Sequence, residues 1–227
     1  AVKENRFGVL HIQHEFSFFP DKFAFEKQLA QLRKAGVKIV MTMHSAVSLG
    51  AYNNMLMKAV DRVVLHSDAQ QKIFLNGFDS KFTTLIRMGC GAPLPLDGVE
   101  DMRRKLGLTD GSPIIGSFGF LRDQKSFHII AKAIQGLRTK YPTMLFFIVS
   151  PEHVFGSKEY DDRFYRFIRN EGMQDFIKIY REFLPEDEVV KTLQCADLFV
   201  MNYEDAPYGG GVSAAVKTVM RTQRPII

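Results

Sequence analysis

Two cationic residues stand where a predicted strand leads into a predicted helix. Gly119 follows the apolar run "PIIGSF", and Arg122 and Lys125 come next, just before a helical pattern. The N-terminus of a helix offers unpaired N–H groups and the positive end of its dipole. An arginine and a lysine beside it would complete an anion site suited to a diphosphate. The alternative is a solvated turn in which Asp123 caps the helix and both cations face water.

A glycine-rich segment precedes a second predicted helix. Gly209, Gly210 and Gly211 come shortly before Ser213, where a helical pattern starts. Glycines allow the backbone to approach a ligand closely and to present several N–H groups to a phosphate. No Gly-Lys-Ser or Gly-Lys-Thr follows, so the segment is not a Walker loop. A flexible turn is the alternative interpretation.

Three histidines end successive predicted strands: His14, which Glu15 follows, His44 and His66. Because the carboxyl ends of parallel strands meet at one edge of a sheet, these side chains are expected at the rim of a cleft. For each histidine taken alone, a packed and hydrogen-bonded residue is the alternative. Metal binding is not expected, because the histidines come from separate strands and form no helical i, i+4 pair.

A fourth candidate follows the apolar stretch "IKIY". Arg181, Phe183 and Leu184 stand there, before Pro185 starts a helical pattern. Backbone amides and an apolar side chain in such a turn could hold a planar base. An ordinary connection between a strand and a helix is the alternative.

Short apolar runs alternate with helical patterns along the chain, which indicates parallel α/β sheets. The segment "GCGAPLPLDGVEDM", rich in glycine and proline, interrupts this alternation and is the best linker candidate. The predicted domains are therefore residues 1–92 and 93–227. The predicted strands lie within residues 7–13, 38–44, 62–67, 83–88, 112–119, 144–150, 177–183, 198–203 and 224–227.

The composition limits the class of protein. No uncharged apolar run approaches the roughly 18 to 20 residues that a membrane span needs, and the first residues lack the pattern of a signal peptide. Cys90 and Cys195 are far apart, which favours neither a disulfide framework nor a zinc site and fits a reducing cytoplasm. A net charge of +5 from scattered cations favours small anionic partners, and no nucleic-acid-binding motif is present.

Taken in order, these segments resemble the retaining, metal-independent, nucleotide-sugar-dependent glycosyltransferases of the GT-B fold. The resemblance covers almost the whole chain and implies two Rossmann-like α/β domains, the N-terminal one incomplete, so the chain is expected to be a fragment of a longer protein. The segments that carry it are "VLHIQHEFSFF", "IVMTMHSAV", "DRVVLHSDAQQKIF", "GSFGFLRDQKSFHIIAKAI", "FLPEDEVVKTLQCADLFVMNY" and "RPII".

The resemblance implies roles for individual residues. Arg122 and Lys125 would bind the donor diphosphate and stabilise the leaving group, and His44 would contact the donor sugar. His14 and Glu15 would lie on the acceptor side. The implied donor-binding residues are Gly119, Arg181, Phe183, Leu184, Gly210, Gly211, Val212, Ser213 and Thr218.

The chain departs from this family at some positions. The family's pair of glutamates would fall near Gly210 and Thr218, and neither residue carries a carboxylate. Glu204 and Asp205 are candidates to replace the first glutamate. Ser126 stands where the family has a glycine after its lysine.

The expected function is transfer of a sugar from a nucleotide-diphosphate donor, with retention of configuration, to a glycan or lipid-linked acceptor in bacterial polysaccharide or lipopolysaccharide biosynthesis. No cofactor, metal or nucleic-acid partner is expected. The expected location is the cytoplasm, with peripheral association at the inner membrane surface. The alternatives are a catalytically inactive GT-B-like binding or scaffolding module of a larger glycan-assembly protein, and a nucleotide-sugar epimerase.

Overall fold

The structure is a computed structural model, and it describes residues 7–47, 49–75, 79–109, 111–152, 158–204 and 209–227. The described residues form two compact units. Unit 1 contains those up to Met88 together with the segment 209–212, and unit 2 contains those from Gly89 to Glu204 and from Ser213 onward. The predicted boundary at residue 92 lies in the segment 86–97, which has neither helix nor strand. The predicted division had placed 209–212 in the second domain.

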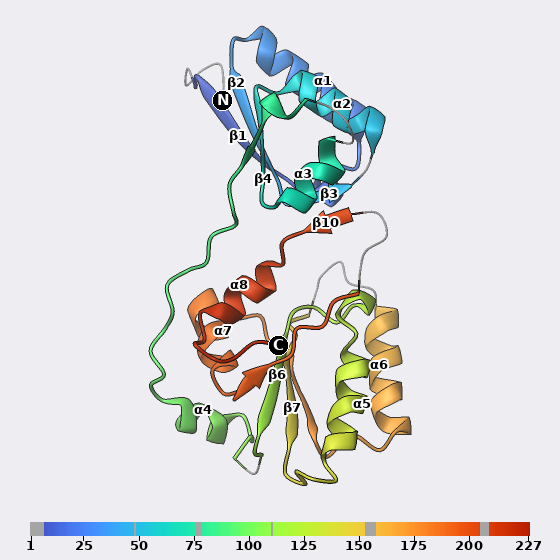
Figure 1. The fold of residues 1–227 in the computed structure, drawn as a ribbon, viewed down its shortest axis with the longest axis vertical. Coiled ribbons are helices and arrows are strands. Elements are labelled where there is room, and N and C mark those ends of the chain that lie inside the picture. The colour runs from blue at the N-terminus through green and yellow to red at the C-terminus, as the bar shows by residue number, and fades with distance from the viewer. Residues whose placement is uncertain (1–6, 48, 76–78, 110, 153–157, 205–208) are drawn as a thin grey trace. The chain divides into compact units, whose positions relative to one another are not determined.

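Unit 1 is built on a parallel sheet with the strand order β1-β2-β4-β5. All of these strands were predicted, as were the helices α1 to α3 that connect them (Figure 1). The strands are β1 (Val9–His14), β2 (Lys38–Met43), β4 (Arg62–Leu65) and β5 (Thr83–Leu85), and the helices are α1 (Lys22–Lys34), α2 (Gly50–Ala59) and α3 (Asp68–Leu75). Two short 3-10 helices, η1 (Phe16–Phe18) and η2 (Ser80–Phe82), complete the connections.

Unit 2 repeats this plan with the parallel strand order β8-β7-β6-β9. Helices α5 and α6 lie on one face of the sheet, and α7 and α8 lie on the other (Figure 1). The strands are β6 (Ile114–Phe118), β7 (Leu145–Val149), β8 (Ile177–Tyr180) and β9 (Leu198–Phe199). The helices are α4 (Val99–Lys105), η3 (Asp123–Lys125), α5 (Phe127–Leu137), α6 (Lys158–Asn170), α7 (Glu186–Leu193) and α8 (Ala214–Met220).

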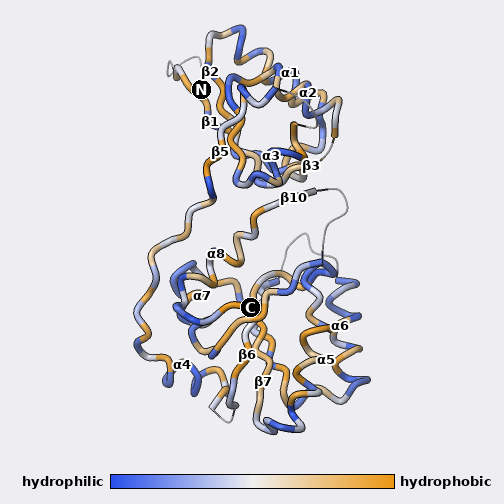
Figure 2. Tube along the Cα trace, in the orientation of Figure 1, coloured by the Kyte–Doolittle hydropathy of each residue, from blue (hydrophilic) through white to orange (hydrophobic). Residues whose placement is uncertain are grey.

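The hydrophobic runs form the interior of unit 2. Every residue of β7 is buried, as expected for a central parallel strand covered on both faces. Figure 2 shows β6 and β7 as mainly hydrophobic, while the helices around them carry hydrophilic residues. The predicted α/β class with two parallel-sheet units is confirmed. The predicted strand 224–227 is an isolated bridge, from Ile226 to Phe199, with backbone hydrogen bonds between Phe199 and both Pro225 and Ile227.

The same aspartate arrangement begins a strand pair in each unit. The Asp61 carboxylate accepts from the Ile39 N–H at 2.8 Å, and the Asp61 N–H donates to the Ile39 carbonyl at 2.8 Å. In unit 2, Asp197 accepts from the Ile114 N–H at 2.7 Å and donates to the Ile114 carbonyl at 2.8 Å. Each carboxylate therefore pairs with an N–H in the first two residues of the neighbouring strand, β2 or β6. The bond from Ile39 is the main reason why the pKa of Asp61 is lowered.

Unit 1 also contains a small antiparallel sheet of two strands, which was not predicted. Its strands are β3 (Ser45–Val47) and β10 (Gly209–Gly211), which pair Gly210 with Ala46 and Gly211 with Ser45. The triple glycine is therefore a short strand, and both predictions for it, a turn and a phosphate-binding loop, were wrong about its conformation. The predicted helix that starts at Ser213 is confirmed as α8.

Candidate functional site

The connection from β6 to α5 folds Lys125 back over the end of its own strand. Gly119 has a φ of +121°, and a Cβ there would lie 2.9 Å from Lys125 Nζ and 3.0 Å from its Cε. The Gly119 N–H also donates to the Val149 carbonyl at 3.1 Å, next to the end of β7. Glycine is therefore favoured by the positive φ, and any side chain here would displace the end of Lys125 from its present position.

The Lys125 ammonium is held inside unit 2. It donates to the Tyr203 hydroxyl at 2.6 Å and to the Phe118 carbonyl at 3.4 Å. Burial, and to a smaller extent the nearby Arg122 guanidinium, lowers the pKa of Lys125 to about 8. The residue is still mainly protonated at neutral pH, so it offers a partly desolvated positive charge next to the carboxyl end of β6.

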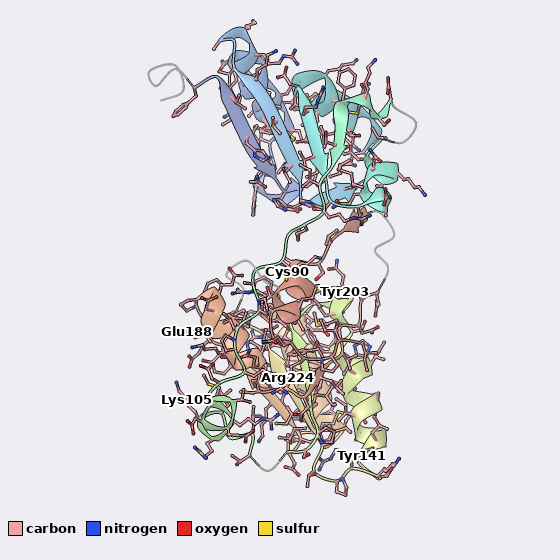
Figure 3. The ribbon with its side chains drawn as sticks, turned by 60° about the vertical axis from the view of Figure 1, so that its left-hand side comes forward. Cys90, Lys105, Tyr141, Glu188, Tyr203 and Arg224 are labelled. Atoms are coloured by element: carbon pink, nitrogen blue, oxygen red, sulfur yellow. The ribbon has the colours of Figure 1, made fainter. Side chains whose placement is uncertain are left out.

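Tyr203 extends this arrangement to the start of α8. Its hydroxyl lies 2.5 Å from Ser213 Oγ, and Ser213 caps α8 by accepting from the Val216 N–H at 3.3 Å. One turn further along, the Thr218 hydroxyl donates to the Ala214 carbonyl at 3.3 Å. The structure therefore brings together predicted residues from two separate connections, Lys125 and Ser213, through Tyr203, which had no predicted role and is labelled in Figure 3. Its place at the end of the predicted strand 198–203 was the available signal.

The turn around Lys125 is fixed by its neighbours. Ser126 adopts a left-handed conformation with a φ of +47°, a conformation that glycine takes with less strain than serine. The Ser126 hydroxyl donates to the Glu204 carboxylate, and the Glu204 N–H donates to the Gln124 carbonyl at 3.1 Å. Glu204, a candidate for the missing first glutamate, is thus engaged in holding this turn. The other candidate, Asp205, lies outside the described residues.

Arg122 and Asp123 are exposed, as the alternative interpretation expected, but Asp123 does not cap the helix. The Arg122 guanidinium lies 5.7 Å from the centre of the Phe120 ring. The Asp123 carboxylate forms an ion pair with Arg163 of α6, and the N-cap residue of α5 is Ser126. The alternative in which Asp123 caps the helix is therefore wrong.

The Arg181 side chain is engaged within unit 2. Its guanidinium donates to Ser150 Oγ at 3.1 Å and to the Asp161 carboxylate at 2.5 Å. Phe183 is 81% exposed and Leu184 is half-buried, so Phe183 offers an open apolar surface beyond the end of β8. The interpretation of this turn as a base-binding site stays a prediction.

His44 and His66 lie together in unit 1, following β2 and β4. Their ring centroids are 5.5 Å apart. His44 Nε2 is 2.8 Å from Gln13 Oε1, and His66 Nδ1 is 2.8 Å from the Ile86 carbonyl oxygen. Burial and then the neighbouring His66 lower the pKa of His44, so His44 is neutral at pH 7 and can act as a hydrogen-bonding group.

His14 lies in an aromatic cluster with Phe16, Phe19, Phe25 and Tyr52. Its side chain is fully buried, its ring stacks on Phe19 at 5.0 Å, and its Nε2 lies 3.3 Å from the Tyr52 hydroxyl. Nδ1 has no hydrogen-bond partner among the described residues. The ring therefore presents no exposed atom to an acceptor substrate. His14 fits the alternative interpretation of a packed residue in the interior.

Glu15 holds the start of a 3-10 helix. Its carboxylate accepts from the Phe16 N–H at 3.1 Å and from the Ser45 hydroxyl. Glu15 thereby links η1 to β3. The prediction that Glu15 lies on the side of the acceptor substrate stays a prediction.

The predicted site residues are divided between the units. Unit 1 contains His14, Glu15, His44, Gly210, Gly211 and Val212. Unit 2 contains Gly119, Arg122, Lys125, Arg181, Phe183, Leu184, Ser213 and Thr218. In the part of the chain that the structure describes, no group of His, Cys, Asp or Glu is placed to hold a metal ion, and no helix is long and apolar enough to cross a membrane.

Comparison with known proteins identifies the fold. No protein-family model and no curated protein matches the chain. Among solved structures, HepE from Anabaena in complex with UDP and glucose aligns with a TM-score of 0.77 and 16% identity, over 99% of this chain and 60% of that one. The fold is that of the GT-B glycosyltransferases.

Two further GT-B structures support this result. A glycosyltransferase from Rickettsia africae aligns with a TM-score of 0.73 and 14% identity, over 99% of this chain and 58% of that one. Sucrose-phosphate synthase from Thermosynechococcus elongatus has a TM-score of 0.70 and 14% identity, over 99% and 56%. The chain thus spans 56% to 60% of the length of these structures. The predicted GT-B fold class is confirmed.

Proposed function

We propose that the chain is part of a glycosyltransferase that takes a nucleotide-diphosphate sugar as its donor. The observation that carries this proposal is the desolvated Lys125 ammonium at the carboxyl end of β6, with Arg122 close enough to lower its pKa. Two fixed cations can stabilise the charge that develops on a departing diphosphate. The GT-B structure of HepE, which contains UDP and glucose, supports this assignment of the ligand class.

Finer features of the reaction are part of the same proposal. The transfer retains the configuration of the sugar and needs no metal, because Arg122 and Lys125 take the role of the cation. His44, neutral and held by Gln13, would contact the donor sugar. The acceptor would be a glycan or lipid-linked sugar in bacterial polysaccharide or lipopolysaccharide assembly. The net charge of +5 would favour a cytoplasmic protein associated peripherally with the anionic inner membrane surface.

A catalytically inactive GT-B-like binding module is the second candidate. The resemblance implies that the family's glutamates would fall near Gly210 and Thr218, which carry no carboxylate, and the Thr218 hydroxyl donates to the Ala214 carbonyl. The Glu204 carboxylate is bonded to Ser126. These residues favour a module that binds a nucleotide and does not turn it over.

Calorimetric titration of UDP, GDP and ADP tests both candidates. We expect one nucleotide to bind with roughly micromolar affinity and its binding to be lost in the double variant Arg122→Ala with Lys125→Ala. Arg104→Ala with Lys105→Ala is the matched control, because these residues form an exposed arginine and lysine pair on α4 of the same unit.

The outcomes separate the two functions. A folded wild-type protein that binds no nucleotide would exclude the donor site. Binding accompanied by release of free nucleotide from the corresponding nucleotide sugar supports an enzyme. Binding without any release supports the inactive module.

A further inference from the structure

The Tyr203 hydroxyl connects two groups of the proposed donor site. It lies 2.6 Å from Lys125 Nζ and 2.5 Å from Ser213 Oγ. Lys125 ends η3, Ser213 precedes α8, and Tyr203 follows β9, so three separate connections of unit 2 meet at this one oxygen atom. The Tyr203 ring also lies 4.2 Å from Lys125 Nζ, within the range of a cation–π interaction.

The lysine sets the direction of one of these hydrogen bonds. A protonated lysine can only donate, so the Tyr203 oxygen accepts from Lys125. Between Tyr203 and Ser213 either hydroxyl can be the donor, and Ser213 Oγ also accepts from the Val216 N–H. In both cases the Tyr203 oxygen is the atom that joins the Lys125 ammonium to the Ser213 hydroxyl.

We propose that Tyr203 is a positioning residue of the donor site, whose hydroxyl orients the Lys125 ammonium and the Ser213 hydroxyl toward the same diphosphate. This inference rests on the proposed function. A lysine side chain is flexible, and ordering it costs conformational entropy at the moment of binding. A fixed acceptor on a rigid aromatic side chain orders the ammonium before the anion arrives, so less of the binding free energy is lost.

The surroundings of Lys125 make Tyr203 its main partner. The positive charge of Arg122, on the same connection, repels that of Lys125 and favours its neutral form. Glu204 follows Tyr203 in the chain, but its carboxylate is bonded to Ser126. Among the described residues, no carboxylate forms an ion pair with Lys125, so loss of the Tyr203 hydroxyl leaves the longer bond to the Phe118 carbonyl and the contact with the ring.

The variant Tyr203→Phe removes this hydroxyl and keeps the ring. In the ligand-free protein, NMR of lysine labelled with carbon-13 at Cε follows the titration of Lys125, whose signal is assigned by its loss in Lys125→Arg. We expect the pKa of Lys125 to fall below its wild-type value of about 8, because the charged form loses an acceptor. Tyr141→Phe is the matched control, since Tyr141 is an exposed tyrosine at the opposite end of unit 2 (Figure 3).

Binding gives the second readout. The probes are the nucleoside diphosphate that binds best among UDP, GDP and ADP, and its nucleoside without phosphates. We expect Tyr203→Phe to weaken the diphosphate about tenfold, as for the loss of one hydrogen bond to a charged group, and to leave the nucleoside unchanged. Affinity for the diphosphate should also begin to fall at a lower pH than in wild type, because Lys125 loses its proton earlier.

The two readouts distinguish this inference from the proposed function. If Tyr203→Phe leaves both the Lys125 titration and the diphosphate affinity unchanged, the positioning role is wrong. A weakening of the nucleoside equal to that of the diphosphate also contradicts it, because the effect would then be structural. If no nucleotide binds the wild type but the Lys125 titration shifts in the variant, the proposed function fails while the control of Lys125 by Tyr203 stands.

Discussion

Acidification should destabilise unit 1 through His14. The ring is fully buried in the aromatic cluster and Nδ1 has no described hydrogen-bond partner, so a proton on the ring would place a charge in a largely apolar site, which the nearby Glu15 carboxylate offsets only in part. Burial lowers the pKa of His14 to about 4, from 6.5 in an exposed histidine. The unfolded chain therefore takes up a proton at a higher pH than the folded protein, and stability falls as the pH drops from about 6.5 toward about 4.

The size of the effect follows from this difference. Each pH unit between the two pKa values removes about 1.4 kcal/mol of folding free energy. Between about pH 7 and about pH 5 the loss is about 2 kcal/mol, and below about pH 4 it levels off at roughly 3 kcal/mol. No reduction for solvent screening applies, because the side chain has no exposed surface.

The variant His14→Phe isolates this contribution. It keeps an aromatic ring beside Phe19 and removes the titration. Hydrogen exchange of the β1 and β2 amides, corrected for intrinsic rates, measures the stability of unit 1 at each pH. Carboxylates affect wild type and variant equally, so we expect the variant to lose about 2 kcal/mol less than wild type between about pH 7 and about pH 5.

The control and the refuting result are both specific. His128→Gln removes an exposed histidine of unit 2 and should leave the pH dependence of unit 1 unchanged. Equal losses of stability in wild type and His14→Phe would show that the His14 ring accepts a proton in the folded state without cost, and the reasoning from burial would be wrong.

Substitutions at two further positions test a turn in unit 2, at Ser126, and the contact of Asp61 with β2 in unit 1. Ser126→Gly should leave a protein about 1 kcal/mol more stable than Ser126→Ala, because both lose the bond to Glu204 and only glycine relieves the positive φ; urea unfolding of unit 2 measures this difference. Asp61→Ala should destabilise unit 1 by about 2 kcal/mol at neutral pH, because it leaves the Ile39 N–H unpaired. Since the folded-state pKa of Asp61 is lowered, part of this contribution is present above the unfolded pKa of 3.8 and is lost as the pH falls through the lower folded value.

A specific result would contradict each of the two predictions, for Ser126 and for Asp61. Equal stability of the Ser126→Gly and Ser126→Ala proteins would mean that the left-handed conformation carries no strain. A loss in Asp61→Ala that stays constant from neutral pH into acid would show that the charge of the Asp61 carboxylate does not contribute.

The order of strands and helices could be read from residues that act locally. Gly36 follows α1 with a φ of +79°, and the Ser67 hydroxyl accepts from the Gln70 N–H at the start of α3, and glycine and serine are local signals for the two ends of a helix. The apolar runs predicted the parallel strands because a strand covered on both faces needs apolar side chains throughout. Even the burial of His14 had a signal, since Leu10, Ile12 and His14 alternate along β1 with the exposed His11 and Gln13.

The pairing of β3 with β10 had no such signal. Gly209 to Gly211 indicate a turn by composition, and three residues are too few to show a strand pattern. Whether they form a strand depends on whether Ser45 to Val47 offers a free edge in register, and these residues are far away in the chain. Local preference is weak here, so the partner strand decides the conformation.

The candidate site shows the same division between local pattern and long-range contact. Arg122 and Lys125 could be chosen from the sequence, because a strand, a glycine and a helix in succession place them at the sheet edge. The contact of Lys125 with Tyr203, and of Tyr203 with Ser213, depends on how β6, β9 and α8 pack and on the space that Gly119 leaves. Periodicity, glycine and capping residues act between neighbours along the chain and are visible in it, whereas a hydrogen bond between residues far apart exists only when packing sets the distance.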